Sequence, residues 1–554
     1  MNIDIKAAER AVYDLCIAGA GPAGIILALE YQKLRPEHHV LLIEYGPRKA
    51  GSHNLMDDSI QIADARNHHL PCECTNKGLG GSSASWGGRC VMYDEIDFLQ
   101  REILKGECTW DLSLFHEAQK HASRAADYFE CGKAEFDLQE VAGFEGRPIA
   151  ENFKNGDVTD TVIERYSMPT RFGSRYRHYI DSSANLHLLE GWEACQLAMH
   201  PNTESVAALG VRDFARLRQA TIKARKFVLA AGAQETTRLL LKNPGVFQNR
   251  AGIPGSLGKY YQGHISGKIA SVRFYGDPRK TDYAFRRTPE GVYLRRRFQL
   301  SQKALLEHNL LNTALWLDNP LYMNPEHRNG AMSLMYLAMI TPGLGKKLAP
   351  PAIAHSITKG KATGIPQHLG NVVRDFPKSL TIPAATFFSR YCLQRKLPGV
   401  FLYSSSNVYA LHFHAEQVPT AENRMELAPD GETLKIHYHY TDQDVDSVIR
   451  THDLLDDWLR QCRCGELDYW HPKTELPEVI HASSKDGIHQ AGTTRIASSV
   501  REGVVDENLK VWGTDNLFVC SSSVFPTSGQ ANPTFLLGAF AVRLANHLSH
   551  HALR

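Results

Sequence analysis

A short glycine motif and one acid are the first residues whose spacing predicts chemistry. An apolar stretch leads directly into the run Gly19-Ala20-Gly21-Pro22-Ala23-Gly24. Its first glycine permits a tight turn, its second lets the backbone approach a pyrophosphate, and its third lets a helix pack closely on a strand. Glu44 follows twenty residues after Gly24, where a carboxylate accepts hydrogen bonds from ribose hydroxyls. The glycines alone would also fit a simple tight turn, but together with Glu44 they indicate a dinucleotide site.

A second glycine cluster occupies Gly78-Leu79-Gly80-Gly81-Ser82-Ser83-Ala84-Ser85-Trp86-Gly87-Gly88-Arg89. Such a run makes a poor helix or strand, and its residues can adopt positive φ and expose successive amides. It is therefore either a flexible surface loop or a loop in close contact with a flat or anionic ligand. Trp86 favours the second interpretation, because an aromatic side chain in a mobile loop would have nothing to pack on.

The elements that position these motifs form three similar blocks along the chain. The pattern predicts a strand at residues 12–18, a helix at 22–34 and a second strand at 40–43. A second block has a strand at 226–231 and a helix at 234–242, and a third has a strand at 517–520 and a helix at 533–547. We therefore expect one nucleotide-binding domain that is interrupted by insertions.

The intervening segments indicate a second domain. Lys268–Tyr275, Asn407–Glu416 and Thr433–Tyr440 have the pattern of antiparallel strands with one solvated face. The expected division is 1–100, 185–260 and 480–554 for the nucleotide domain, and 101–184 and 261–479 for the substrate domain. Residues 344–398 form a distinct insertion with one acid, Asp375, and nine basic residues: Lys346, Lys347, Lys359, Lys361, Arg374, Lys378, Arg390, Arg395 and Lys396. This insertion is either a basic lid or docking face for an anionic or membrane-bound substrate, or a solvated segment without a partner.

The composition narrows the class of protein. A chain of 554 residues accommodates two large domains, and a net charge of +2 disfavours nucleic acid as a partner. The N-terminus lacks the pattern of a signal peptide, and no apolar stretch reaches the roughly 20 residues of a membrane-spanning helix. Eleven scattered cysteines predict ordinary thiols in a reducing compartment, with no metal site. We therefore expect a cytoplasmic protein; its oligomeric state is left open.

Five stretches in order resemble the glucose-methanol-choline (GMC) oxidoreductase family. They are the first glycine motif, the GLGGSS cluster, VLAAGAQETTRLLL at Val228–Leu241, EQVPTAENR at Glu416–Arg424, and the C-terminal block from His489 to Thr534. The resemblance spans nearly the whole chain, and the C-terminal block is the most specific part. It implies an α/β fold in which a Rossmann-type FAD-binding domain carries an inserted substrate domain of antiparallel sheet and helices.

The resemblance also implies two catalytic residues, His489 and Asn532. His489 would take the hydroxyl proton of an alcohol while a hydride passes to flavin N5, and Asn532 would hold the substrate oxygen. Each residue has a second interpretation. His489 could simply order its loop, and Asn532 before Pro533 could cap the following helix. His481 has no motif support.

The cofactor implied is noncovalent FAD. The SASWGG context of Trp86 resembles the pyranose-oxidase-like and bacterial sugar-alcohol branch, whose pyranose oxidases attach FAD through a histidine just before that tryptophan. Ser85 stands at this position and cannot form that bond. The expected cofactor-binding residues are Gly19, Gly21, Pro22, Ala23, Gly24, Glu44, Gly80, Gly81, Ser82, Ser83, Ser85, Trp86, Gly87, Gly88, Ala194, Ala231, Gly232, Ala531, Asn532, Pro533 and Thr534.

The expected reaction is oxidation of an alcohol group of a sugar, glycoside or glycosylated metabolite, with oxygen or another carrier as electron acceptor. Two other functions are open. The chain could use its flavin without net redox chemistry, as the related hydroxynitrile lyases do, or could bind a ligand without turnover. Reduction of the flavin by substrate separates these alternatives.

Overall fold

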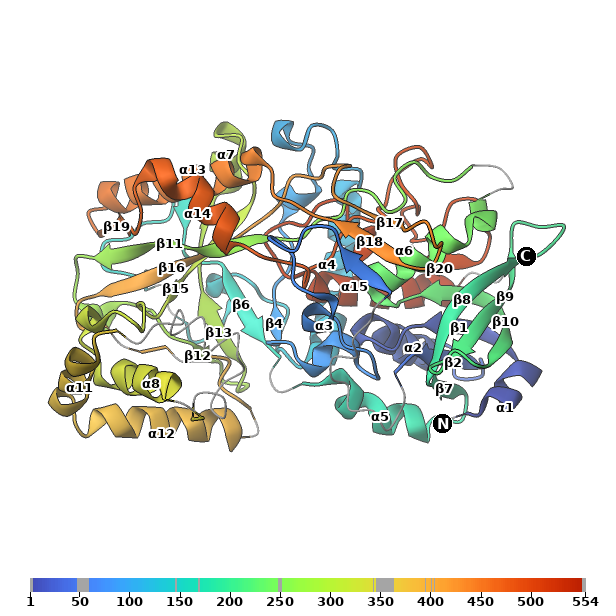
Figure 1. The fold of residues 1–554 in the computed structure, drawn as a ribbon, viewed down its shortest axis with the longest axis horizontal. Coiled ribbons are helices and arrows are strands. Elements are labelled where there is room, and N and C mark those ends of the chain that lie inside the picture. The colour runs from blue at the N-terminus through green and yellow to red at the C-terminus, as the bar shows by residue number, and fades with distance from the viewer. Residues whose placement is uncertain are drawn as a thin grey trace.

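Two large β-sheets, one in each half of the molecule, organise the fold (Figure 1). The computed structural model describes residues 3–46, 59–144, 147–167, 170–247, 252–341, 343–344, 363–393, 395–399, 401–402 and 404–550. Helices cover both sheets, and two smaller sheets lie between and beside them. The expected α/β class is confirmed.

The larger sheet assembles strands from distant parts of the sequence. β1 (Val12–Ala18) pairs in parallel with β2 (Val40–Glu44) and β10 (Gln219–Leu229). β7 (Leu186–Glu190) extends the sheet beyond β2, and β20 (Leu517–Val519) pairs in parallel with β10. The three blocks expected from the sequence therefore meet in one sheet.

One strand of this sheet is longer than the sequence predicted. β10 begins at Gln219 rather than near residue 226, because its first half pairs antiparallel with β9 (Val206–Asp213). β9 in turn pairs with β8 (Trp192–Met199). The alternating burial of residues 219–225 marks this half as a surface ribbon, whereas Phe227–Leu229 are buried inside the sheet.

Helices pack on the larger sheet at the points where its strands end. α2 (Pro22–Leu34) follows β1, and α15 (Pro533–His550) packs against both α2 and α4 (Leu112–Phe129). α6 (Gly232–Lys242) follows β10.

The division of the chain into two domains stays a prediction. Other helices are α1 (Ile5–Arg10), α3 (Pro71–Cys74), α5 (Phe172–Ser182) and α7 (Gln302–Glu307).

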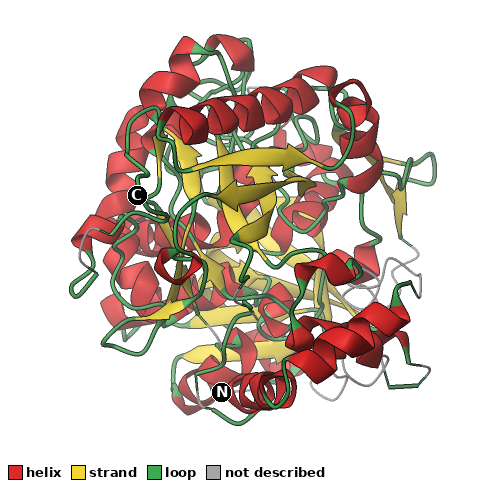
Figure 2. Cartoon of the chain, turned by 90° about the vertical axis from the view of Figure 1, so that its left-hand side faces the viewer, coloured by secondary structure: helices red, strands yellow, loops and turns green. Residues whose placement is uncertain are grey.

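The second sheet is antiparallel. Its order is β19 (Gly465–Tyr469), β11 (Ile265–Phe274), β16 (Val408–Ala415), β15 (Thr313–Asp318), β14 (Phe298–Leu300) and β5 (Val158–Thr159). α13 (Asp442–Gln461) and α14 (Leu476–Ser483) lie over it, and Figure 2 shows helices above its strands from the end of the molecule. This sheet agrees with two of the three predicted antiparallel segments.

The third predicted segment, Thr433–Tyr440, lies elsewhere. β18 (Leu434–His437) belongs to a three-stranded sheet, antiparallel to β17 (Arg424–Leu427) and parallel to β3 (Ile60–Ile62). Alternation indicated a strand with one buried face but could not identify its partners. The remaining sheet joins β4 (Arg89–Cys90), β6 (Ile163–Tyr166), β13 (Tyr293–Arg296) and β12 (Arg286–Arg287).

One further expectation is corrected, and the basic insertion, for which no secondary structure was predicted, is also described. The second glycine cluster contains a short 3₁₀ helix, Gly81–Ala84, although its composition predicted no helix. The described part of the basic insertion is mainly helical, with α11 (Ile365–Arg374) and α12 (Lys378–Tyr391) packed against α8 (Gly330–Ile340); Lys346, Lys347, Lys359 and Lys361 lie outside the described residues. Among the described helices, no apolar stretch is long enough to cross a bilayer.

Candidate active site

The three glycines at the turn from β1 into α2 have different steric environments. Gly19 has a φ of +109°, and a Cβ there would lie 2.4 Å from the carbonyl oxygen of Ala230. A Cβ on Gly24 would lie 2.0 Å from the carbonyl oxygen of Gly19, whereas one on Gly21 would meet nothing within 4 Å. The middle glycine therefore borders open space at the N-terminus of α2, where amides and the helix dipole favour a phosphate.

Glu44 is buried at the end of β2 and joins the two glycine segments. Its carboxylate accepts backbone hydrogen bonds from Ala20 (3.1 Å), Gly46 (2.9 Å) and Gly78 (2.8 Å). Burial raises the pKa of Glu44, against the opposing effect of these three donors. A carboxylate offers about four lone-pair positions, so a ribose hydroxyl can still bond here. The role of Glu44 in joining the two segments was not predicted from the sequence.

The second glycine cluster is anchored to the protein. Gly80 has a φ of +95°. The indole nitrogen of Trp86 donates to the Thr170 carbonyl at 3.0 Å, and its ring lies against Phe129 and Phe172. These contacts do not fit a loose surface loop. The backbone of the cluster is therefore held in place near Glu44.

The serines of this cluster differ in their partners. Ser83 is buried, donates to the Gly80 carbonyl at 2.6 Å and accepts from the Phe172 amide at 3.1 Å. Ser85 is exposed, and its hydroxyl accepts a 2.6 Å hydrogen bond from the Asn76 side chain. Ser83 thus supports the loop. Ser82, Ser85 and Gly87 are exposed, so these positions of the cluster are accessible to a ligand.

Other predicted cofactor residues lie at two places. Ala231 and Gly232 form the turn into α6, and a Cβ on Gly19 would lie 2.6 Å from the Ala231 nitrogen. Ala194 lies on β8, opposite Val211 of β9. The first pair is adjacent to the glycine turn, and a cofactor role for all three stays a prediction.

The structure brings His489 and Asn532 together across 43 residues of sequence. The side-chain amide of Asn532 donates to His489 Nε2 at 2.7 Å. Its Oδ1 is buried and has no hydrogen-bond partner among the described residues. The interpretation of the Asn532 side chain as a helix cap is therefore wrong, because the amide is directed at His489 and its oxygen caps nothing. Ala531, Pro533 and Thr534 place this amide at the start of α15.

Asp486 lies on the Nδ1 side of the His489 ring. Its Oδ2 is 3.5 Å from His489 Nδ1, and its Oδ1 accepts the backbone N–H groups of Gly487, Ile488 and His489. Burial acts to raise the pKa of Asp486, but His489 and His264 outweigh it and hold the pKa well below its usual range. The carboxylate favours a proton on Nδ1 of His489, which leaves the Nε2 lone pair facing Asn532. Sequence reasoning missed Asp486, although its position three residues before His489 was a usable signal.

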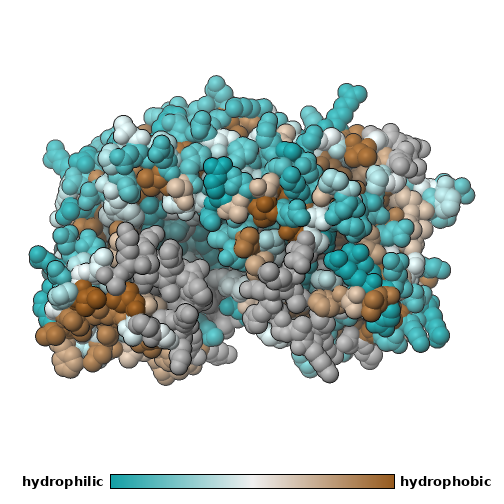
Figure 3. All heavy atoms as spheres, in the orientation of Figure 1, coloured by the Kyte–Doolittle hydropathy of each residue, from teal (hydrophilic) through white to brown (hydrophobic). Residues whose placement is uncertain are grey.

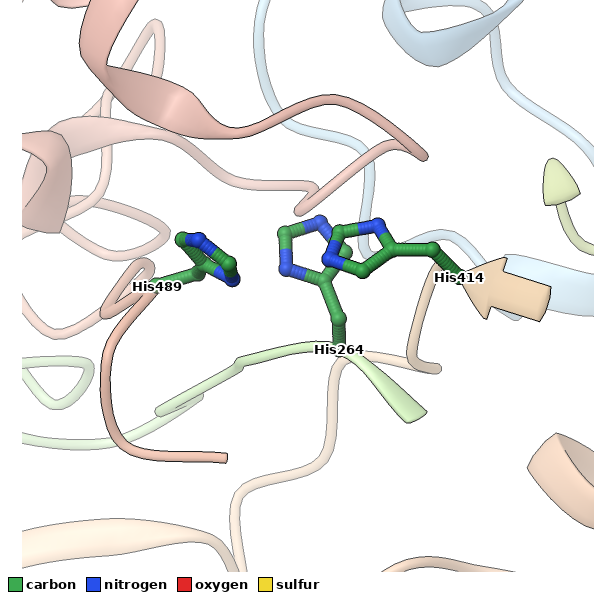
Figure 4. Close-up of side chains that lie close together, drawn as sticks. All are labelled: His264, His414 and His489. Carbon is green, nitrogen blue, oxygen red and sulfur yellow. The ribbon is translucent and has the colours of Figure 1, made fainter. Parts of the chain in front are cut away.

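Two further histidines lie on one side of His489 (Figure 4). The rings of His264 and His489 are 4.9 Å apart at 80°, and those of His264 and His414 stack at 4.0 Å and 28°. His414 Nδ1 donates to the Gln530 carbonyl at 2.9 Å. Burial lowers the pKa of both His264 and His414, so both rings stay neutral near pH 7. Sequence reasoning missed both histidines, because strand patterning does not show which side chains face a site.

The three histidines were not expected to hold a metal, yet one nitrogen from each lies within 4.8 Å of the others. Imidazole is a common ligand for zinc, copper and nickel. The rings of His264 and His414 lie 28° from parallel. The described residues thus bring three possible metal ligands together, and the expectation of no metal stays a prediction.

Two other features lie apart from this cluster. A cavity of about 520 Å³ is lined by residues that include Lys105, Tyr260 and Gln443, and by none of the predicted site residues. His481 on α14 lies 3.9 Å from Asp442. Neither feature joins the cluster of His489, Asn532 and Asp486.

Comparison with known proteins gives a family match for part of the sequence and a fold match over nearly its full length. Residues 419–541 match the family model described as GMC oxidoreductase. A 63-residue segment is 36% identical to 2-methyl-1,2-propanediol dehydrogenase of Mycolicibacterium austroafricanum and covers 11% of each chain. A 60-residue segment is 32% identical to a long-chain-alcohol oxidase of Arabidopsis thaliana, over 11% of this chain and 8% of that one. The matched segments thus span about a tenth of these relatives.

Solved structures share the fold over nearly the full length. A fungal aryl-alcohol oxidase aligns with a TM-score of 0.51 and 17% identity, over 97% of this chain and 99% of that one. Pyridoxine 4-oxidase from Mesorbium loti aligns with a TM-score of 0.51 and 18% identity, over 98% and 100%. Formate oxidase aligns with a TM-score of 0.52 and 16% identity, over 97% and 98%. At these identities the likeness concerns the fold.

Proposed function

We propose that the chain is a GMC-type, FAD-dependent oxidoreductase that oxidises an alcohol, CH–OH to C=O, with His489 as the base. The observation that carries the proposal is the 2.7 Å contact between His489 Nε2 and the Asn532 amide at the start of α15. The family match over residues 419–541 includes both residues, and the fold of alcohol-oxidising enzymes supports the same conclusion.

The residues around the glycine turn fit FAD. Open space at Gly21 and the N-terminus of α2 suit the pyrophosphate, and the Glu44 carboxylate suits a ribose. The Gly80–Gly88 segment and the start of α15 would lie against the flavin. Bound FAD would supply the hydride acceptor. We propose that it binds noncovalently, since Ser85 offers no imidazole for attachment.

The side chains around His489 have different roles in the transfer of the substrate's hydroxyl proton. Asp486 holds the Nδ1 proton of His489, so that Nε2 can accept the proton of a substrate hydroxyl. The Asn532 amide, which bonds to Nε2 here, can then donate to the alkoxide oxygen. The neutral rings of His264 and His414 limit the positive charge beside His489 and exclude water from one side of it.

The finer identity of the substrate is also a proposal. We propose a sugar, glycoside or glycosylated metabolite as donor, oxygen or another carrier as acceptor, and the cytoplasm as the location. The sugar class rests on the SASWGG context of Trp86. The names of the relatives, a diol dehydrogenase and a long-chain-alcohol oxidase, support an alcohol donor without selecting one class.

Anaerobic reduction of the bound flavin tests the function. The purified protein should show flavin absorbance, and one class among sugars, glycosides and simple alcohols should bleach it. His489→Ala should retain the flavin and lose the bleaching, while the matched control His481→Ala should keep both. A bound flavin that no alcohol reduces would favour non-redox chemistry, and a protein that cannot be loaded with flavin would exclude the proposal.

A further inference from the structure

α11 buries two of its polar side chains and exposes most of its apolar ones. His368 and Asn371 are buried, whereas Ile365, Leu369 and Val373 are exposed, Val373 to 75%. A helix in contact with water normally has the reverse arrangement, with its apolar stripe on the core. The outer face of α11 therefore exposes apolar surface that water does not favour.

Hydrogen bonds of the inner face fix this orientation. His368 Nδ1 bonds to the Ser333 hydroxyl of α8 at 2.9 Å. The Asn371 amide donates to the Pro325 carbonyl at 2.8 Å and to Ser333 at 3.2 Å. The ring of Tyr336 packs on His368 at 4.4 Å. Rotating α11 to bury its apolar side would break these bonds and leave buried polar groups unpaired.

α12 continues the same surface. Leu380, Ile382, Phe387 and Phe388 are exposed on it, and Phe376 is exposed between the two helices. Eight of the nineteen strongly exposed large apolar side chains of the described chain lie within the 24 residues 365–388. Figure 3 shows the resulting apolar patch at the lower left, where Figure 1 has α8, α11 and α12. We call the exposed side chains of residues 365–388 the α11–α12 face.

The charge of this segment is as unusual as its apolar surface. Residues 344–398 carry nine basic residues and one acid, although the whole chain has 62 and 60. Arg374 and Lys378 are both exposed and flank Phe376, and Arg374 also pairs with Asp375 at 2.9 Å. Basic side chains beside exposed aliphatic and aromatic ones are typical of elements that lie in a membrane interface.

We propose that the α11–α12 face docks the protein on a membrane surface rich in anionic lipid. Apolar side chains would enter the headgroup boundary, while basic side chains are attracted to the negative surface. A second copy of the chain fits less well, because a symmetric contact would place this basic segment against itself. The proposal does not depend on the proposed reaction.

Vesicle sedimentation of the purified protein tests the docking. We expect the protein to sediment with vesicles of phosphatidylcholine and phosphatidylglycerol, and much less with phosphatidylcholine alone. Salt at about 0.5 M should weaken the binding. Leu369→Gln with Val373→Gln should weaken it by about 10-fold or more, because two apolar anchors leave the interface.

Matched controls keep the result interpretable. Leu217→Gln with Ile253→Gln changes two apolar side chains elsewhere that are at least as exposed on average, and should leave vesicle binding unchanged. Melting temperatures should match for all variants, since each position is exposed. Failure to bind anionic vesicles, or binding that survives the Leu369 and Val373 changes, would overturn the proposal. A dimer that these changes dissociate, without vesicle binding, would also overturn it and identify a second copy as the occupant.

Discussion

The glycine turn and the cluster around His489 are built in opposite ways. In the turn, the proposed site is formed by the backbone of consecutive residues 19–24, and a Cβ on Gly21 would meet open space. In the cluster, side chains meet from four separate places: His264 before β11, His414 on β16, the segment Asp486–His489, and Asn532 at α15. A backbone site is local in sequence, whereas a side-chain site depends on the packing of both halves of the molecule.

The largest effect expected is on the glycine turn, where two substitutions separate folding from binding. Gly24→Ala should destabilise the protein by about 3 kcal/mol, because its Cβ would clash with the Gly19 carbonyl. Gly21→Ala should change the unfolding free energy by less than about 0.5 kcal/mol, since open space surrounds it. Chemical denaturation and flavin titration measure both quantities.

Gly21→Ala should nevertheless weaken flavin binding, because its methyl group would enter the space proposed for the pyrophosphate. Equal destabilisation by the two substitutions, or unchanged flavin affinity in Gly21→Ala, would show that the turn is not the binding site described above.

The next largest effect is expected in the cluster. Asp486→Asn should slow flavin reduction by about 100-fold at saturating substrate, because His489 loses the carboxylate that holds its Nδ1 proton. Flavin content should not change, since the turn is a separate site. Asp442→Asn, on an exposed side chain, is the control. A normal reduction rate in Asp486→Asn would show that Asp486 does not assist His489 in the reaction.

These two sites also show what the sequence can predict. Gly19, Gly24 and Glu44 were predictable because their conformations and spacing are local requirements of a βαβ turn. His489 and Asn532 were predicted by resemblance, and the structure brings their side chains together. Asp486, His264 and His414 were missed because their convergence is a property of tertiary packing. The inverted polarity of α11 was missed for the same reason, since composition gave its charge but not its buried face.

The smallest effect concerns a histidine outside the cluster. His452 on α13 is fully buried against Phe413 of the antiparallel sheet, and burial lowers its pKa to about 4. Because an unfolded histidine titrates near 6.5, the unfolded state binds more protons between these values, and stability is lost as pH falls through this range. His452 should account for about 2 kcal/mol of the loss between pH 7 and pH 5.

Denaturation of His452→Gln at both pH values checks this contribution. The variant should lose less unfolding free energy than the wild type on acidification. An identical loss would show that His452 is not held neutral in the folded protein.

The most direct test of the central claim is the rate of anaerobic flavin reduction by the best alcohol of the panel and by the same alcohol deuterated at the CH–OH carbon. We predict slower bleaching with the deuterated alcohol in the wild type, and loss of at least about 100-fold in rate in His489→Ala with its flavin still bound. Reduction that is insensitive to deuterium and unaffected by His489→Ala would contradict hydride removal with His489 as the base.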